Sequence, residues 1–153
     1  MTEPGAVEAW LVLAAGIGSG MLGGFYLAFS LVVMPALRDR PAGEAASAMI
    51  AINEAAVRAP FMVLFFGTAL ACLIVVATGW STPGAPIRVL GALASLTGWV
   101  LTMAINVPLN TRLARTERST VVWHAYARPW IRANHFRAGL SLLGALGLLN
   151  PLP

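Results

Sequence analysis

The sequence predicts an all-α fold: a four-helix transmembrane bundle with short interfacial helices on its cytoplasmic side. Hydrophobic residues make up 58% of the chain and charged residues only 10%, and the mean hydropathy is +0.77. So many apolar side chains beside so few charges indicate that a lipid bilayer is the solvent. The apolar residues form long stretches, and arginines gather between them. We therefore treat residues 1–153 as one membrane domain.

Four spans can be assigned from these stretches. The first stops at Pro35, because a proline cannot continue the hydrogen bonding of a helix. The second begins at Pro60, a residue type favoured in the first turn of a helix. The predicted spans are residues 7–34, 60–80, 86–107 and 129–149.

The fourth span rests on a length argument. Its apolar core, Gly139 to Leu149, is only 11 residues long, whereas a helix needs about 20 residues to cross a bilayer. The span must therefore begin near Pro129 and include the stretch WIRANHFRA. We expect this polar turn to lie at the membrane boundary or inside the bundle.

The arginines predict the orientation in the cell (inner) membrane. They concentrate in two segments between spans, residues 35–59 and 107–137, and no basic residue occurs near either terminus. By the positive-inside rule, both segments are cytoplasmic and both termini lie outside. The first segment holds Arg38, Arg40 and Arg58, and the second holds Arg112, Arg115, Arg118, Arg128, Arg132 and Arg137.

Each cytoplasmic segment also contains a predicted short helix. In the first, apolar residues recur at helical spacing, which indicates an amphipathic helix: Ala45, Met49, Ile52 and Ala56. In the second, Ser119 or Thr120 is the expected N-cap, and Pro129 is expected to break the helix. Aromatic residues with a polar group favour a membrane interface, so we expect Trp123, Tyr126 and Trp130 there.

Polar residues gather at the cytoplasmic ends of the spans. Asn106 and Asn110 close the third span, while Asn134, His135 and Arg137 open the fourth. Two antiparallel neighbouring spans would bring these groups to similar depth. A candidate base at His135, beside amide donors and aromatic walls, suits proton abstraction from an oily, enolisable substrate.

Each of these residues also has a structural interpretation. Asn110 alone is better explained as a helix cap, and Pro108 as a helix end. Asn106 needs partners inside the bundle, and a carbonyl freed by Pro108 is one candidate. His135 alone is typical of a structural histidine, and Arg137 is equally suited to reaching the lipid headgroups.

Other classes of site find little support in the sequence. Cys72 is the only cysteine, so neither an intramolecular disulfide nor a cysteine-based metal cluster is predicted. His124 and His135 are 11 residues apart, which is roughly 16 Å on one continuous helix, although a bend at Pro129 leaves proximity open. We predict no metal and no cofactor. The arginines indicate topology and not a nucleic-acid surface.

Small residues in the first span indicate close helix packing. Gly16, Gly20 and Gly24 are spaced four residues apart in GIGSGMLGG, the small-xxx-small pattern of membrane helices that touch. This pattern leaves a homo-oligomer open without requiring one.

Several segments resemble the anthrone oxygenase-like membrane proteins, a group long described as a domain of unknown function. The resemblance covers about residues 16–149, and its most specific elements are NVPLN and W-x3-NH-x-R. The segments that carry it are GGFYLAFSLVVMPAL, AMIAINEAAVRAPFMVLFFGTAL, NVPLNTRLA and WHAYARPWIRANHFRAGLSL.

The resemblance implies a compact four-helix membrane bundle. Fungal members of the group are implicated in oxidising anthrones to anthraquinones with molecular oxygen and without an established cofactor. Most bacterial members have no assigned substrate. The family pattern falls on Asn53, Asn106, Pro108, Asn110, Trp123, Trp130, Asn134, His135 and Arg137.

Two hypotheses follow. In the first, the protein is a cofactor-independent membrane oxygenase whose cosubstrate is molecular oxygen and whose substrate is an apolar polycyclic phenol or anthrone. His135, Asn106, Asn134 and Arg137 are then the catalytic candidates, and Asn53, Asn110, Trp123 and Trp130 the substrate-binding ones. In the second, the protein binds a lipid or quinone, or packs against a membrane partner, without catalysis. An open cavity beside the asparagines favours the first hypothesis, and a filled interior favours the second.

Overall fold

The computed structural model describes residues 4–79, 84–116 and 120–150, and no strand occurs in these ranges. The predicted all-α fold is confirmed there. The elements, with α for α-helices and η for π-helical turns, are α1 (Pro4–Ala28), η1 (Phe29–Val33), α2 (Met34–Arg38), α3 (Ala42–Ala56), α4 (Ala59–Thr78), α5 (Ala85–Leu101), η3 (Thr102–Asn106), α6 (Val107–Arg115) and α7 (Thr120–Leu148).

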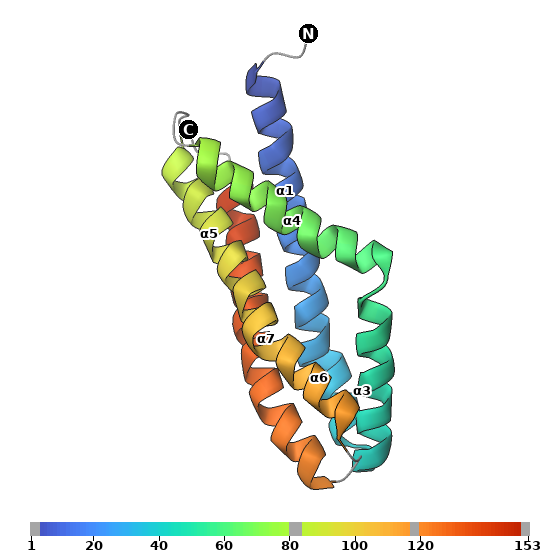
Figure 1. Ribbon diagram of the computed structural model, residues 1–153. Coiled ribbons are helices and arrows are strands. Elements are labelled where there is room, and N and C mark those ends of the chain that lie inside the picture. Colours follow the sequence, from blue (N-terminus) through green and yellow to red (C-terminus); the bar gives the residue numbers. More distant parts are fainter. Residues whose placement is uncertain (1–3, 80–83, 117–119, 151–153) are drawn as a thin grey trace.

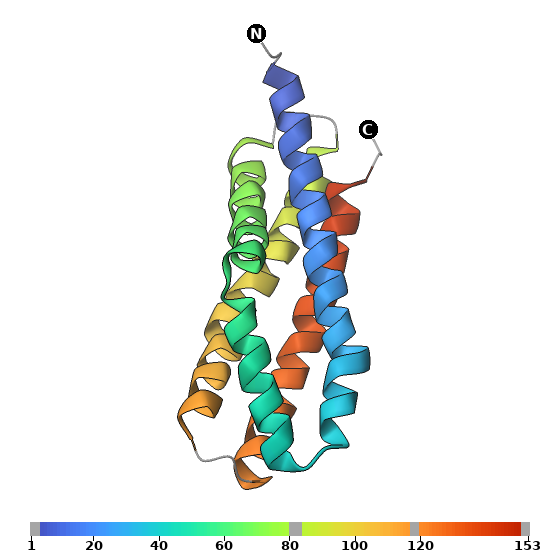
Figure 2. The ribbon, with the colours of Figure 1, turned by 90° about the vertical axis from the view of Figure 1, so that its right-hand side faces the viewer.

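Four long helices, α1, α4, α5 and α7, form an elongated bundle (Figure 1 and Figure 2). The helix α7 makes the most extensive contacts, with α5 and with α1, and α4 packs against both α1 and α5. The start of α1 and the end of α7 lie at the same end of the bundle (Figure 1). At the opposite end, α3 and α6 pack against α7 and close the bundle.

Three of the segments are long and apolar enough to cross a membrane: Gly5–Arg38, Ala59–Thr78 and Ala85–Arg115. They contain the first three predicted spans, except that the second segment ends at Thr78, before Gly79, and that Trp80 lies outside the described residues. Their outward faces carry exposed apolar side chains such as Leu31, Val63 and Leu90, which suit contact with lipid. The chain is therefore a membrane protein. The fourth predicted span lies in α7, whose first half carries several arginines and which is not among the three.

Two prolines lie inside continuous helical segments, and the predicted helix ends at both are wrong. A proline ring clashes with the carbonyl four residues back, and the chain accommodates it by widening the preceding turn. Before Pro35, the N–H of Met34 bonds to the carbonyl of Phe29, five residues back. Before Pro108, the N–H of Val107 bonds to the carbonyl of Thr102 in the same way.

The second arginine-bearing segment, residues 107–137, is more helical than the sequence predicts. Asn110 does not cap a helix, because α6 continues to Arg115. The predicted break at Pro129 is also wrong, because α7 runs without interruption through that residue. His124 and His135 therefore stay roughly 16 Å apart along one helix axis, too far to share an ion. The helix begins at Thr120, and Ser119 lies outside the described residues.

The predicted amphipathic helix is confirmed as α3, which buries Ala45 and Met49 completely. Its apolar face packs in a core cluster with Trp123, Tyr126 and Trp130 of α7. These three aromatic side chains are 2–4% exposed. They lie inside the protein and do not face the membrane interface as predicted, because α3 and α6 cover them.

The helices α5 and α7 touch through their backbones. A Cβ atom on Gly91 would lie 2.8 Å from the carbonyl oxygen of Gly144, and one on Gly147 would lie 3.0 Å from the carbonyl oxygen of Ile87. Separations that short leave no room for a side chain at either glycine unless the neighbouring backbone shifts. This close approach fixes the height of α7 relative to α5, and therefore the depth at which its polar residues lie.

Two of the three glycines in the small-residue pattern of the first span pack against α7. A Cβ on Gly16 would meet the side chain of Leu149, and one on Gly20 would lie 3.7 Å from Ala145, so both glycines face α7. Gly24 has nothing within 4 Å of such an atom. The pattern therefore serves the α1–α7 contact inside the chain.

Candidate functional site

A cavity of about 250 Å³ lies between η1, α3, the start of α4, η3 and α7. Its walls are mainly aromatic and aliphatic, and both π-helical turns contribute to them. The apolar lining includes Phe25, Phe29, Phe61, Met62, Phe65, Phe66, Met103 and Trp130. The polar side chains in the lining are Tyr26, Asn53, Thr102, Asn110 and Arg137. Such a mixture of apolar walls and a few polar groups is typical of sites for small ligands.

Among the described residues of this lining, Arg137 is the one cation, and its side chain is 5% exposed. Its guanidinium carbon lies 4.1 Å from the ring centre of Tyr26 and 5.0 Å from that of Trp130. Nε and Nη2 both donate to Asn134 Oδ1, at 3.0 and 2.8 Å, and Nη1 donates to Thr102 Oγ1 at 3.3 Å. Aromatic faces and neutral acceptors thus hold a buried positive charge.

The hydrogen-bonding capacity of Arg137 is only partly used. A guanidinium has five N–H donors, and three bond to the protein, which leaves two without a partner among the described residues. No carboxylate lines the cavity in the described ranges. A buried cation without a counter-ion is costly, so the cavity is suited to an anion or to a ligand that develops negative charge.

Asn134 orients this arginine. Its Nδ2 donates to the carbonyl oxygen of Tyr26 and to Ser30 Oγ, both at 2.8 Å, while its Oδ1 accepts the two bonds from Arg137. All four bonding positions of the amide are therefore occupied. Asn134 is buried behind Arg137 and does not line the cavity.

His135 lies outside the cavity. Its side chain is exposed, and its Nδ1 is 2.8 Å from Ser30 Oγ. Because Ser30 Oγ already accepts from Asn134, its own O–H can donate to the imidazole. The structure thus does not bring the predicted base to the cavity, but it does connect His135 to Arg137 through Ser30 and Asn134.

A second polar group of the lining is formed around Asn110. Its Oδ1 accepts from Tyr126 Oη and from Trp130 Nε1, each at 2.9 Å. These two bonds fix the amide so that Nδ2 is the end left to bond elsewhere. Asn53 faces the same cavity, and its buried Nδ2 has no hydrogen-bond partner among the described residues.

Tyr126 keeps its proton in this environment. Burial raises the pKa of its phenol, while the side chain of Asn53 and the charge of Arg137 oppose that rise. The hydroxyl is therefore a lasting donor to Asn110 Oδ1 at neutral pH.

Asn106 and Trp123, the remaining predicted site residues, are buried outside the lining. Asn106 Nδ2 donates to the carbonyl oxygen of Trp130 at 3.3 Å and ties η3 to α7. Its Oδ1 has no partner among the described residues. Trp123 packs in the core cluster beneath the cavity.

A model of the anthrone oxygenase family matches residues 51–147. That range covers more than half of the chain. The chain belongs to the anthrone oxygenase family. No curated protein and no solved structure gives a significant match.

The family match contains most of the polar cavity lining, Asn53, Thr102, Asn110 and Arg137, but it leaves out α1. The contribution of α1 to this anthrone oxygenase family member was not predicted: Tyr26 stacks on Arg137, and Ser30 links Asn134 to His135. The predicted likeness in GGFYLAFS points to this segment but assigns no role to either residue. The aromatic wall from α4 was also missed, because Phe61, Phe65 and Phe66 look like ordinary residues of a span.

No group of three or more His, Cys, Asp or Glu side chains that could hold a metal ion occurs in the described parts of this family member. The polar cavity lining consists of amides, hydroxyls and one guanidinium. Amides and guanidinium groups are good hydrogen-bond donors, and a guanidinium does not ligate cations. The described polar lining can therefore donate hydrogen bonds to a ligand that carries oxygen acceptors.

Proposed function

We propose that this protein is a membrane oxygenase that oxidises an apolar polycyclic phenolic or anthrone-like substrate with molecular oxygen. One observation carries the proposal: an aromatic-walled cavity that contains a buried arginine without a carboxylate in its described lining. Membership of the anthrone oxygenase family supports the same class of reaction. The proposal requires no organic cofactor or metal, and dioxygen is the cosubstrate.

The chemistry starts from an acidic carbon. Loss of one proton from the CH2 group between the rings of an anthrone gives an enolate, whose negative charge lies largely on its oxygen. Arg137 would bind that oxygen through its two unused N–H groups, with Asn53 or Asn110 as further donors. Because these donors bind the enolate more strongly than the neutral ketone, they favour deprotonation.

Dioxygen then oxidises the enolate. A new C–O bond forms at the deprotonated carbon and gives a hydroperoxide after protonation. The second C–H proton leaves as the O–O bond breaks, so that the carbon becomes a carbonyl. The substrate loses two hydrogen atoms and gains one oxygen atom, and the other oxygen atom ends in one molecule of water.

The proton acceptor is not a carboxylate or an imidazole of the described lining. We propose that the proton passes to water and that Arg137 supplies the driving force for its loss. His135 would then act indirectly, because Ser30 and Asn134 connect it to Arg137 by hydrogen bonds.

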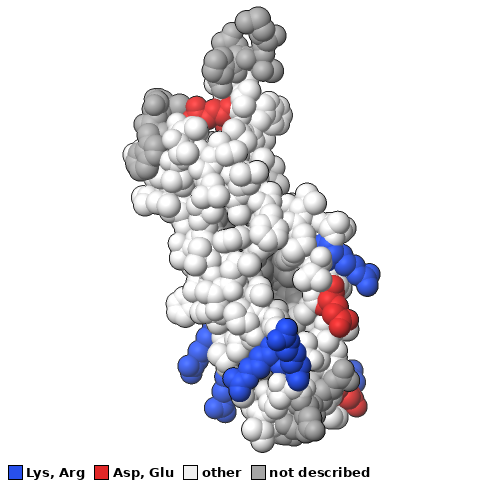
Figure 3. All heavy atoms as spheres, viewed as in Figure 1, with Lys and Arg blue, Asp and Glu red and all other residues white. Residues whose placement is uncertain are grey.

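An apolar substrate would reach the cavity from the lipid phase. Several of the described side chains that line it are also exposed at the protein surface, and all are apolar: Phe25, Val57, Phe66, Met103 and Val107. On the face shown in Figure 3, the surface is hollowed between α3, α4 and α6, which carry part of the cavity lining. An uncharged rim of this kind favours a ligand that is dissolved in the bilayer.

We further propose that residues 129–148 of α7 form the fourth crossing, so that the chain forms a four-helix transmembrane domain. These 20 residues correspond to about 30 Å, and α7 packs against three helices that are apolar enough to span a membrane. The arginines visible in Figure 3 lie in the half of the molecule remote from the start of α1. By the positive-inside rule that half is cytoplasmic and both termini are outside.

The test is quinone formation by membranes that contain the protein. An anthrone is added, and both quinone appearance and oxygen consumption are followed, with one O2 expected per quinone. Arg137→Gln should lower the rate roughly a hundredfold or more, because it removes the charge that stabilises the anion. The matched control is Arg132→Gln, an exposed arginine on the same helix, which should keep the wild-type rate.

An unchanged rate in Arg137→Gln would contradict the proposal, and so would a wild-type rate no higher than that of empty membranes. A second function, binding of a lipid-soluble quinone without catalysis, is favoured by the same donor-rich lining, because quinone carbonyls accept hydrogen bonds. It predicts saturable quinone binding that depends on Arg137, with no oxygen consumption when an anthrone is supplied.

A further inference from the structure

A second, much smaller cavity lies in the middle of the bundle, where α1, α4, α5 and α7 meet. Its volume is about 10 Å³. It shares Tyr26 and Phe65 with the large cavity, so these two side chains separate the two spaces. We call it the serine chamber after three of its lining residues, Ser19, Ser95 and Ser141.

Each of the four helices brings a hydroxyl group to the serine chamber. Ser19 comes from α1, Thr68 from α4, Ser95 from α5 and Ser141 from α7. All four residues are buried. Polar groups in a membrane-embedded interior require partners, because no solvent is available to them there.

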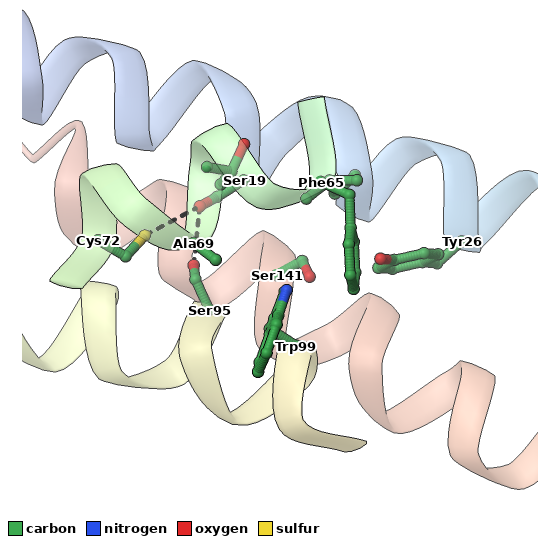
Figure 4. A pocket seen from close by; sticks show the side chains of 10 residues that line it. Ser19, Tyr26, Phe65, Ala69, Cys72, Ser95, Trp99 and Ser141 are labelled. Carbon is green, nitrogen blue, oxygen red and sulfur yellow. Dashed lines mark hydrogen bonds between the residues drawn. The ribbon is translucent and has the colours of Figure 1, made fainter. Parts of the chain in front are cut away.

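Only some of the polar groups in the chamber form hydrogen bonds with one another. Ser19 Oγ and Ser95 Oγ are 2.8 Å apart, and Ser19 Oγ also lies 4.0 Å from the sulfur of Cys72 (Figure 4). The indole nitrogen of Trp99 lines the same chamber and is directed toward Ser141 (Figure 4). This nitrogen is buried and has no hydrogen-bond partner among the described residues.

A buried N–H without an acceptor costs about 1–3 kcal/mol. The Trp99 N–H therefore needs a hydrogen-bond acceptor small enough to fit inside the chamber. A volume of 10 Å³ is close to the roughly 10–15 Å³ that one water molecule needs, and a buried water usually makes two to four hydrogen bonds. A larger polar ligand does not fit, and no charged side chain in the described lining favours an ion.

We propose that the serine chamber binds one ordered water molecule. The water accepts the Trp99 N–H and donates to hydroxyl oxygens of the surrounding helices, with Ser141 the nearest candidate in Figure 4. It links α5 to α7 directly behind the wall that Tyr26 and Phe65 form for the large cavity. This site is independent of the proposed oxygenase function, because it rests on groups that do not contact the substrate.

The proposal is tested by NMR on protein with 15N-labelled tryptophan in lipid nanodiscs. Magnetisation transfer from water is measured at each indole N–H, and Trp99→Phe assigns the Trp99 signal. We expect transfer at Trp99 even though its nitrogen is enclosed by the four helices. Trp123 serves as the internal control, because it is buried in the core cluster, lines neither cavity and should show little transfer.

A space-filling substitution locates the water. Ala69 lines the chamber, whereas Ala71 on the same helix is equally buried and does not. Ala69→Val should abolish the transfer at Trp99, and Ala71→Val should preserve it. Absence of transfer in the wild-type protein overturns the proposal, and so does transfer that persists in Ala69→Val with the other indole signals unchanged.

Discussion

Asn134 Oδ1 accepts two hydrogen bonds from Arg137, from Nε at 3.0 Å and from Nη2 at 2.8 Å. Both residues are at most 5% exposed, so water cannot replace either partner easily. The amide orients the guanidinium, and two of its five N–H donors have no partner among the described residues. A buried charge in this protein is thus positioned by a neutral group and not by a counter-ion.

Replacement of this amide should weaken the fold and the site together. Asn134→Ala leaves two guanidinium N–H groups without their acceptor and removes a hydrogen-bond donor from the Tyr26 carbonyl, so we expect the free energy of unfolding to fall by about 2 kcal/mol. Denaturant titration in mixed micelles measures the change. Thr97→Ala is the control, because that exposed hydroxyl bonds only within its own helix. A fall no larger than that of the control would show that the amide does not hold Arg137.

The two substitutions of His135 distinguish a base from a positioning residue. In His135→Asn, the amide oxygen can take the place of Nδ1 as acceptor for Ser30, whereas His135→Ala removes the contact. We expect His135→Asn to keep most of the anthrone-dependent oxygen consumption and His135→Ala to lose about tenfold. If the imidazole is the catalytic base that the sequence predicts, both variants will be equally inactive.

Tyr126 should make stability sensitive to alkaline pH. Burial raises the pKa of its phenol in the folded protein, so the native state keeps the proton after an unfolded chain has lost it. This contribution is fully present below the ordinary tyrosine pKa of about 10 and is lost as the pH rises above it. The melting temperature of wild-type protein should therefore fall more steeply above pH 10 than that of Tyr126→Phe. Parallel curves would contradict the assignment, although Tyr126→Phe should itself cost about 1 kcal/mol at neutral pH.

The close contact of α5 and α7 can be tested at one glycine. A Cβ on Gly91 would press on backbone atoms of α7, which cannot move aside as a side chain can. We expect Gly91→Ala to destabilise the protein by roughly 1–3 kcal/mol, as overpacking does. Gly67→Ala is the matched control, because its Cβ would have open space and alanine favours helix. Equal stability of the two variants would exclude the backbone contact.

Much of the fold could be predicted because apolar stretches mark the segments that can lie in a bilayer and arginines mark the segments between them. The helical segments, the amphipathic α3 and the antiparallel neighbours α5 and α7 follow from these local patterns. The predictions that helices end at Pro35 and Pro108 were wrong, because a π-helical turn lets each helix continue past its proline. That choice depends on packing around the turn, which a local pattern does not contain.

Half of the predicted site residues line the candidate cavity, and the arrangement of the others was not predicted. Asn53, Asn110, Trp130 and Arg137 do line one cavity. His135 and Asn134 are adjacent in sequence, yet they face different sides of α7, with Asn134 buried and His135 exposed. Which of the two would point inward depends on where α1 packs, and the role of Ser30 between them required the structure.

Each of the two π-helical turns contains one residue more than an ordinary α-helical turn would need. A π turn is an α-helix with one residue inserted, so the segments on its two sides keep their packed faces in place. Deleting one residue within Phe29–Val33 or Thr102–Asn106 would return an ordinary turn and leave both neighbouring faces in phase, provided that Pro35 or Pro108 is replaced as well, because an ordinary turn restores the clash of the proline ring. The same deletion elsewhere in a span would rotate everything beyond it by about 100°. Single-residue length changes among relatives should therefore fall in these two turns, beside the cavity.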